Sequence, residues 1–164
     1  MGVDIHMYIV KNKNIIKENV FDGRNSEWFN NIQGDGNSDE YDHFPIYKYG
    51  VSEQAPDELI KEANEDYYYG HRTVKVSDFK QWFNKYRPDK QASWVTTYDK
   101  WRIENKGFTP DDFDYKFQLN KDDVIEDWHF VEWIDRYDCS AWLYNFLLEE
   151  KIDDDADITY WFDH

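Results

Sequence analysis

The first ten residues constrain the fold more than any other part of the chain. Two alternating sets of side chains make up this stretch: apolar Val3, Ile5, Met7 and Ile9, and the set Asp4, His6, Tyr8 and Val10. Alternation with a period of two is typical of a half-buried β-strand, because successive side chains of a strand point to opposite faces of its sheet. The chain therefore begins with a strand that carries an acid and an imidazole on one face.

The acid in this strand needs a partner, because aspartate is disfavoured in strands. One interpretation is that Asp4 is a surface carboxylate paired with a nearby lysine or arginine. The other is that Asp4 and His6 lie in a pocket and contact a ligand, a metal ion or each other. The sequence leaves both interpretations open.

Length and composition predict a single folded domain over residues 1–164. The formal charge of −16 favours disorder, but 20% of the residues are Phe, Trp or Tyr, and disordered chains are poor in aromatic residues. Each aromatic side chain can bury a large apolar area. We therefore expect a folded protein with an aromatic-rich core and an acidic surface.

The same composition excludes several classes of function. Binding to duplex nucleic acid needs clustered lysine and arginine, which this acidic chain does not have. Cys139 is the one cysteine, so neither a disulfide framework nor a thiolate zinc cluster is expected. No signal peptide precedes the first strand, and no apolar run is long enough to cross a membrane. We expect a soluble cytoplasmic protein without a membrane partner.

Hydrophobic periodicity and turn residues predict the remaining elements. Strands are expected near residues 72–76, 115–119 and 156–162, and residues 11–17 are expected to form a turn followed by a short strand or its remnant. Helices are expected over residues 24–32, 56–66, 77–86, 92–103, 120–137 and 140–147, and a surface loop over residues 33–42. Strands at both ends with helices between them indicate an α+β fold. The expected architecture is a mainly antiparallel sheet that includes the N- and C-terminal strands, with helices packed on it.

Five short segments, taken in order, resemble one family. They are Met1-Gly2-Val3-Asp4-Ile5-His6, Arg24-Asn25 with Trp28-Phe29, Phe44-Pro45-Ile46 with Gly50-Val51, Gly70-His71 with Val76-Ser77, and Trp161-Phe162-Asp163-His164. The chain is similar in these segments to small phage and prophage proteins that begin Met-Gly-Cys-Asp-Ile-His and end Phe-Asp-Asn. The resemblance implies a setting in an infected or lysogenic cell, and it implies a site. It implies no reaction.

Departures from the family pattern limit the chemistry of that site. Val3 stands where the family has cysteine, so a thiol at this position is not essential. Arg72 and Val74 stand in place of the family's serines, which argues against a hydroxyl nucleophile in that segment. The final residue is His164, where the family has asparagine.

The polar residues that match the family motifs are Asp4, His6, Arg24, Asn25 and His71, with Asp163 as a further candidate. Two histidines and one acid are a ligand set suited to a divalent metal, and Asp4, His6 and His71 would supply it. A water bound to that metal would attack a phosphate ester. The chain has no metalloprotease-type spacing to support this phosphoesterase-like hypothesis.

The hypothesis that we favour is capture of a small nucleotide-like ligand without turnover. Arg24 can donate two parallel hydrogen bonds to a phosphate or carboxylate, Asn25 can bind an amide or a base edge, and aromatic rings can stack on a base. In a phage setting, such a protein would serve counter-defence or host takeover. The run Tyr67-Tyr68-Tyr69 either lines this site or packs in the core.

A third hypothesis is an acidic inhibitor of a host protein, including a nucleic-acid mimic. The acids that would form its binding face are Asp111, Asp112, Asp114, Asp122, Asp123, Glu126 and Asp127. A solvated acidic surface without a partner is the plainer interpretation of the same residues. The sequence predicts no oligomeric state.

Overall fold

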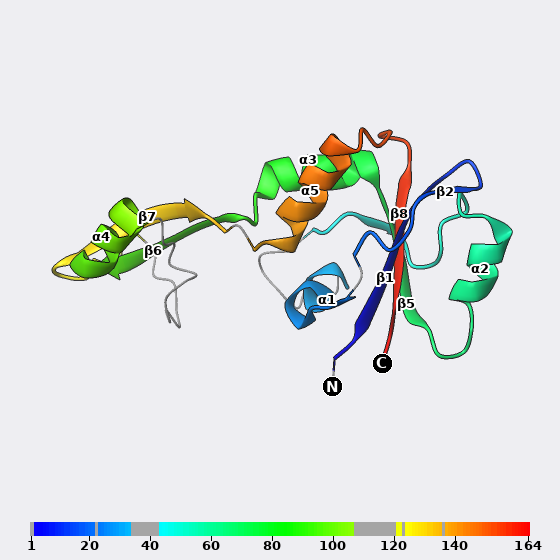
Figure 1. Cartoon of the computed structure of the whole chain (residues 1–164), viewed down its shortest axis with the longest axis horizontal. Coiled ribbons are helices and arrows are strands. Elements are labelled where there is room, and N and C mark those ends of the chain that lie inside the picture. The colour runs from blue at the N-terminus through cyan, green and yellow to red at the C-terminus, as the bar shows by residue number, and fades with distance from the viewer. Residues whose placement is uncertain (1, 22, 34–42, 107–120, 123, 136) are drawn as a thin grey trace. The chain divides into compact units, whose positions relative to one another are not determined.

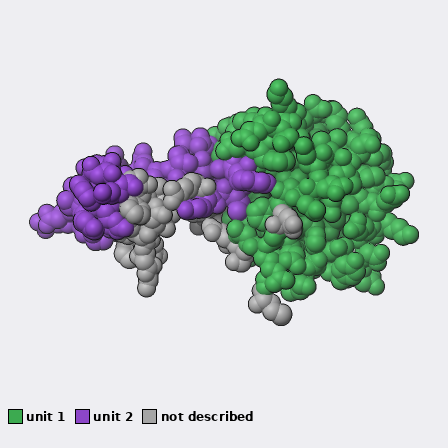
Figure 2. Space-filling model, viewed as in Figure 1, with its two compact units in different colours: residues 1–86, 143–164 green, residues 87–142 purple. Residues whose placement is uncertain are grey.

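The structure of the protein is a computed structural model, and it describes residues 2–21, 23–33, 43–106, 121–122, 124–135 and 137–164. The chain divides into two compact units (Figure 2). The first comprises Met1–Tyr86 and Leu143–His164, and the second comprises Arg87–Trp142. The first unit contains both ends of the chain and the candidate site.

The first unit is built on an antiparallel sheet. Its strands are β1 (Asp4–Lys11), β2 (Asn14–Lys17), β3 (Gly23–Arg24), β4 (Ile46–Lys48), β5 (Tyr69–Lys75) and β8 (Asp157–Asp163). The order is β2-β1-β8-β5-β4, and β3 pairs with β1 outside this path. The C-terminal strand therefore lies between the N-terminal strand and β5, and it is buried from Asp157 to Phe162. The predicted α+β fold, with both terminal strands in an antiparallel sheet, is confirmed.

Helices cover both faces of this sheet. The helix α2 (Asp57–Ala63) lies on one face, and α1 (Ser26–Ile32), α3 (Val76–Tyr86) and α5 (Cys139–Glu149) lie on the other (Figure 1). Asn25 caps α1, because its side-chain oxygen accepts a hydrogen bond from the backbone N–H of Trp28 at 2.8 Å. Asp57 and Glu58 stabilise the first turn of α2, where acidic side chains are favourable.

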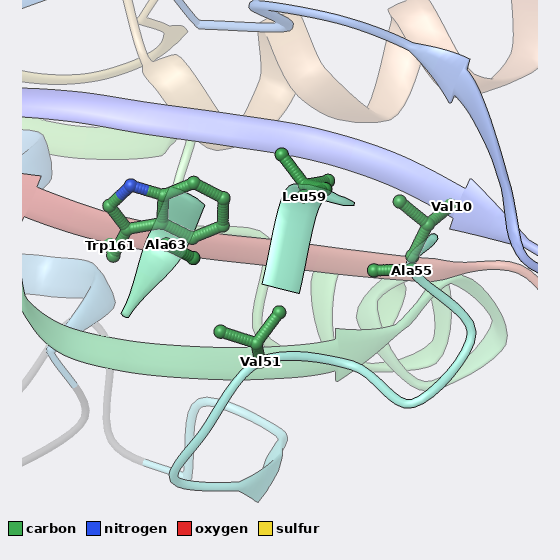
Figure 3. Packing of buried hydrophobic residues seen from close by; sticks show 6 residues of the cluster. All are labelled: Val10, Val51, Ala55, Leu59, Ala63 and Trp161. Carbon is green, nitrogen blue, oxygen red and sulfur yellow. The ribbon is translucent and has the colours of Figure 1, made fainter. Parts of the chain in front are cut away.

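The face covered by α2, called here the α2 face, has an apolar centre and polar ends. Its centre is a cluster of buried side chains: Val10, Val51, Ala55, Leu59, Ala63 and Trp161 (Figure 3). Strand alternation places Asp4 and His6 on this face at the start of β1, and the pairing of β1 with β8 places Asp163 beside Asp4. Asp157 is paired with Val10 at the opposite end of the same two strands.

The second unit corrects two expectations. Residues 90–106 form a strand, β6 (Lys90–Thr96), followed by the helix α4 (Thr97–Lys106), instead of a helix from residue 92. The predicted helix over residues 120–137 is wrong, because Trp128–Ile134 is the strand β7, which pairs with β6 in an antiparallel ladder. Aromatic and β-branched residues dominate β7, and these types favour strands when a partner strand is available.

Two further expectations fall on parts that the structure does not describe: the strand over residues 115–119 and, beyond residue 33, the loop to residue 42. The N-terminus of α3 differs slightly from the prediction, since the helix begins at Val76 and Ser77 lies within it. Within the described ranges, no helix is both long and apolar enough to cross a bilayer.

Candidate functional site

The candidate site is formed where the two ends of the chain meet on the α2 face. Asp4 is paired with Arg24 of β3 on one side and with Asp163 of β8 on the other. His6 follows two residues later on the same face of β1, about 7 Å along the strand. Strand pairing thus brings together four charged or titratable side chains from the two ends of the sequence.

These side chains form two hydrogen-bonded pairs. Arg24 Nε donates to Asp4 Oδ1 at 2.7 Å, and His6 Nε2 lies 2.7 Å from Asp163 Oδ2. The hydrogen bond from Arg24 lowers the pKa of Asp4, and its contacts with Asp163 and His6 act in the same direction. The Arg24 side chain is 61% exposed, whereas His6 and Asp163 are 27% and 19% exposed. The terminal guanidinium nitrogens of Arg24 therefore face solvent, and none of the described residues pairs with them.

A glycine keeps Arg24 close to the start of the chain. A Cβ atom at Gly2 would lie 2.6 Å from Cδ of Arg24, a distance that carbon atoms do not tolerate. The hydrocarbon part of Arg24 therefore lies against a backbone that has no side chain. The segment that begins at Met1 and the segment that contains Arg24 meet at this contact.

Aromatic rings surround His6. The ring of Tyr68 meets that of His6 edge-on, with centroids 5.1 Å apart, and Trp161 stacks at 6.4 Å on another side. Tyr8 stacks on the same Trp161 at 5.2 Å. Burial and the neighbouring Tyr67 raise the pKa of Tyr68 to about 12, so its hydroxyl stays protonated at neutral pH. Of the three consecutive tyrosines, Tyr68 lines the site, and Tyr67 is largely exposed.

Trp161 has an unusual environment for a buried indole. It is 1% exposed, and its Nε1 has no hydrogen-bond partner among the described residues. Leaving a buried donor without an acceptor costs roughly 1–3 kcal/mol. Figure 3 shows the nitrogen edge of the ring turned away from Leu59 and Val10, and therefore toward the end of the sheet where β1 begins. A ligand acceptor that reached this edge would satisfy the donor.

A bulge in β5 lies beside His71. Tyr69 pairs with Phe162 and Arg72 pairs with Tyr160, so β5 has one residue more than β8 over this interval. Gly70 occupies the bulge with φ +69°, in the left-handed region that favours glycine. Thr73 faces Thr159 on the α2 face, and alternation places His71, two residues earlier, on the same face. There its ring lies 6.0 Å from Trp161 and its Nε2 donates to the backbone carbonyl of Ala63.

The structure brings together three of the five predicted site residues. Asp4, His6 and Arg24 form one cluster, joined by the further candidate Asp163. Asn25 caps α1. The ring of His71 lies 6.0 Å from Trp161, and its Nε2 donates to the carbonyl of Ala63 in α2. Among the described residues, no three His, Cys, Asp or Glu side chains are grouped so that they could hold a metal ion.

The sequence left open whether Tyr68 lines the site or packs in the core, and it did not assign Trp161 to the site. The alternation over residues 156–162 was a usable signal, because it places Trp161 and Asp163 on one face of β8. Of the acids proposed for a protein-binding face, Asp122, Glu126 and Asp127 are exposed in the second unit. Asp111, Asp112, Asp114 and Asp123 lie outside the described residues.

Comparison of the chain with family models, with curated proteins and with solved structures finds no match.

Proposed function

We propose that the protein captures a small nucleotide-like ligand at the site formed by Asp4, His6, Arg24 and Asp163. The observation that carries the proposal is the state of Arg24. Its guanidinium is fixed through Nε by Asp4, and its side chain is 61% exposed, so the terminal nitrogens remain available to a ligand. A guanidinium oriented in this way is suited to a phosphate or carboxylate, because it donates two parallel hydrogen bonds without losing much side-chain freedom.

The rings near Arg24 supply the second half of the recognition. His6 lies two strand residues from Asp4, about 7 Å along β1, and the ring of Tyr68 contacts that of His6 with centroids 5.1 Å apart. Stacking of a base on an aromatic ring is worth about 1–3 kcal/mol and tolerates every base. A ligand ring against Tyr68 would lie near Trp161, whose ring centroid is 6.1 Å from that of Tyr68 and whose buried Nε1 has no partner among the described residues.

The charges of the site limit the charge of the ligand. Asp4 and Asp163 contribute two carboxylates to the site, and Arg24 is the permanent cation among its four residues. A ligand with one phosphate or carboxylate is therefore favoured over a polyphosphate, whose additional charges would face the two carboxylates.

The geometry favours capture over metal-dependent hydrolysis. The His6 Nε2 bond to Asp163 leaves Nδ1 for a ligand, as in the histidine–aspartate pairs that act as general bases. A hydrolase would in addition need a nucleophile or a metal-bound water beside this nitrogen. His71, the third member of the proposed metal set, uses its Nε2 for the Ala63 carbonyl instead.

The biological role that we propose follows from the family resemblance. A phage-type protein that retains a nucleotide-like molecule without converting it would lower the concentration of a host signal. This role belongs to counter-defence or host takeover in the cytoplasm of the infected cell.

Native mass spectrometry tests the proposal. The protein is incubated with a small-molecule extract of bacterial cells, and the bound mass is compared between the unchanged chain, Arg24→Met and a control, Lys48→Met, which removes one cation at the other end of the sheet. We expect an adduct of nucleotide size that survives a chelator, persists in the control and is lost in Arg24→Met.

Three results would reject capture at this site. They are a bare mass for the unchanged chain, an adduct that Arg24→Met retains, and steady conversion of the bound molecule during incubation. Loss of the adduct in chelator would support the hydrolase hypothesis instead.

A further inference from the structure

A second candidate site lies at the opposite end of the α2 face. A cavity of about 570 Å³ lies where β4 and β5 meet the start of β8, and its lining includes Tyr47, Lys75, Asp157 and, at the rim, Asp154 and Asp155. The apolar cluster around Leu59 covers the face between this cavity and the site at Arg24. The cavity belongs entirely to the first unit.

Asp157 is the buried acid of this cavity. The residue is 2% exposed, and its Oδ2 accepts hydrogen bonds from Tyr47 Oη at 2.7 Å and from Ser52 Oγ at 2.5 Å. Both donors are neutral hydroxyls, and both bind the same carboxylate oxygen. In the part of the chain that the structure describes, Oδ1 has no hydrogen-bond partner and no cation pairs with Asp157.

The nearest lysine does not neutralise this carboxylate. Lys75 stands opposite Asp157 in the β5–β8 ladder, but its ammonium lies over the ring of Tyr47, 5.1 Å from the centroid. The acids at the rim are already paired, since Lys80 Nζ lies 2.7 Å from Asp154 and Lys11 Nζ lies 2.9 Å from Asp155. Asp157 is therefore the acid of the cavity whose charge a bound cation would neutralise.

The cavity is suited to an organic cation. A buried carboxylate that has only neutral donors is costly, and a bound cation offsets that cost. The ring of Tyr47 offers a face that attracts ammonium groups, as Lys75 already shows. Burial and Asp157 raise the pKa of Tyr47, so its hydroxyl remains a donor to the carboxylate. A metal ion is less suited, because no group of three ligands exists among the described residues.

We propose that this cavity binds a primary ammonium group of a small organic amine, with Asp157 as the anion that receives it. Lys75 acts as a competing internal cation at the mouth of the cavity. Its positive charge opposes the entry of a second ammonium group. The proposal concerns a different ligand and different residues from the site at Arg24, and neither site depends on the other.

Calorimetric titration with 1,4-diaminobutane at low salt tests this assignment. Asp157→Asn keeps an oxygen to accept from Tyr47 and Ser52 but removes the charge, so affinity is expected to fall at least about tenfold, as for the loss of one charge-assisted hydrogen bond. Lys75→Met is expected to raise affinity, because it removes the competing cation and leaves Asp157 in place. Asp66→Asn, an equal change at an exposed acid away from the cavity, should leave affinity unchanged.

Butane-1,4-diol and inorganic phosphate complete the experiment. The diol has the same length without charge and should not bind. Absence of diamine binding to the unchanged chain, or equal weakening by Asp66→Asn, would overturn the proposal, since the latter would mean general attraction of cations to an acidic surface. Phosphate binding that Lys75→Met abolishes would assign the cavity to an anion instead. Because Lys75→Met spares the buried hydrogen bonds, the test holds even where Asp157→Asn does not fold.

Discussion

Replacing Gly70 with alanine should destabilise the first unit severely. Gly70 has φ +69°, and a Cβ built on it would lie 2.6 Å from Cδ2 and 3.0 Å from Cε2 of Phe162. The left-handed conformation costs an L-residue about 1–2 kcal/mol. Phe162 is 1% exposed, so moving its ring strains a packed core, at a cost of about 1–3 kcal/mol. The expected loss is the sum, about 2–5 kcal/mol.

Hydrogen exchange of the β5–β8 amides in the native state measures this loss, because these amides report the first unit alone. Gly50→Ala is the matched control, since its Cβ would meet only the flexible end of Lys48 at 3.3 Å and its effect should stay within about 0.5 kcal/mol. Equal protection of the β5–β8 amides in Gly70→Ala and Gly50→Ala would refute the reasoning that the left-handed backbone of Gly70 and its close contact with Phe162 require glycine.

Three further predictions concern titration and the buried network. Folding lowers the pKa of Asp4 below its ordinary value of 3.8, so the Arg24–Asp4 pair stabilises the fold above that pH and loses its effect as the pH falls through the lower folded value. Urea midpoints from pH 2 to 7 should show that Arg24→Met is less stable than the unchanged chain at neutral pH, and that the difference vanishes in acid. Burial raises the pKa of Tyr160 well above 10.0, so stability should fall as the pH rises beyond that value, by up to about 1.4 kcal/mol per pH unit; Tyr160→Phe should make the decline shallower in the same assay. Thr159→Val removes the acceptor of the buried Ser52 N–H, 3.1 Å away, and should cost about 1–3 kcal/mol, whereas Thr97→Val at an exposed position should change the unfolding free energy little.

The sequence predicted the strands best where one face is buried. Alternation in residues 3–10 and 156–162 has a single structural explanation, and both stretches are strands that pair with each other. The segment Trp128–Ile134 was misassigned because Trp128, Val131 and Ile134 also fit a helical period. Which period is realised depends on β6, about 35 residues earlier along the chain, and a local pattern contains no such information.

The sequence predicted part of the site. It could not predict the rest, because a local pattern does not show which distant segments lie against each other. Asp4 and His6 follow from strand alternation, and the polar motif containing Arg24 reaches them through β3. Asn25 and His71 have structural roles, one as a helix cap and the other as a donor to the end of α2. These roles depend on where α1 begins and on where α2 ends beside β5, neither of which the motifs alone define.

The most direct test of ligand capture follows two side-chain N–H signals of the labelled protein, Arg24 Nε–H and Trp161 Nε1–H, in nitrogen–proton correlation spectra. Trp161→Phe and Arg24→Met assign the signals, and an unlabelled small-molecule extract of bacterial cells is the probe. If a ligand binds at this site, both signals shift in a saturable way, and the Trp161 signal stays in place in Arg24→Met. Signals that do not move in the extract, or a Trp161 shift that persists without Arg24, would contradict a ligand site at this end of the sheet.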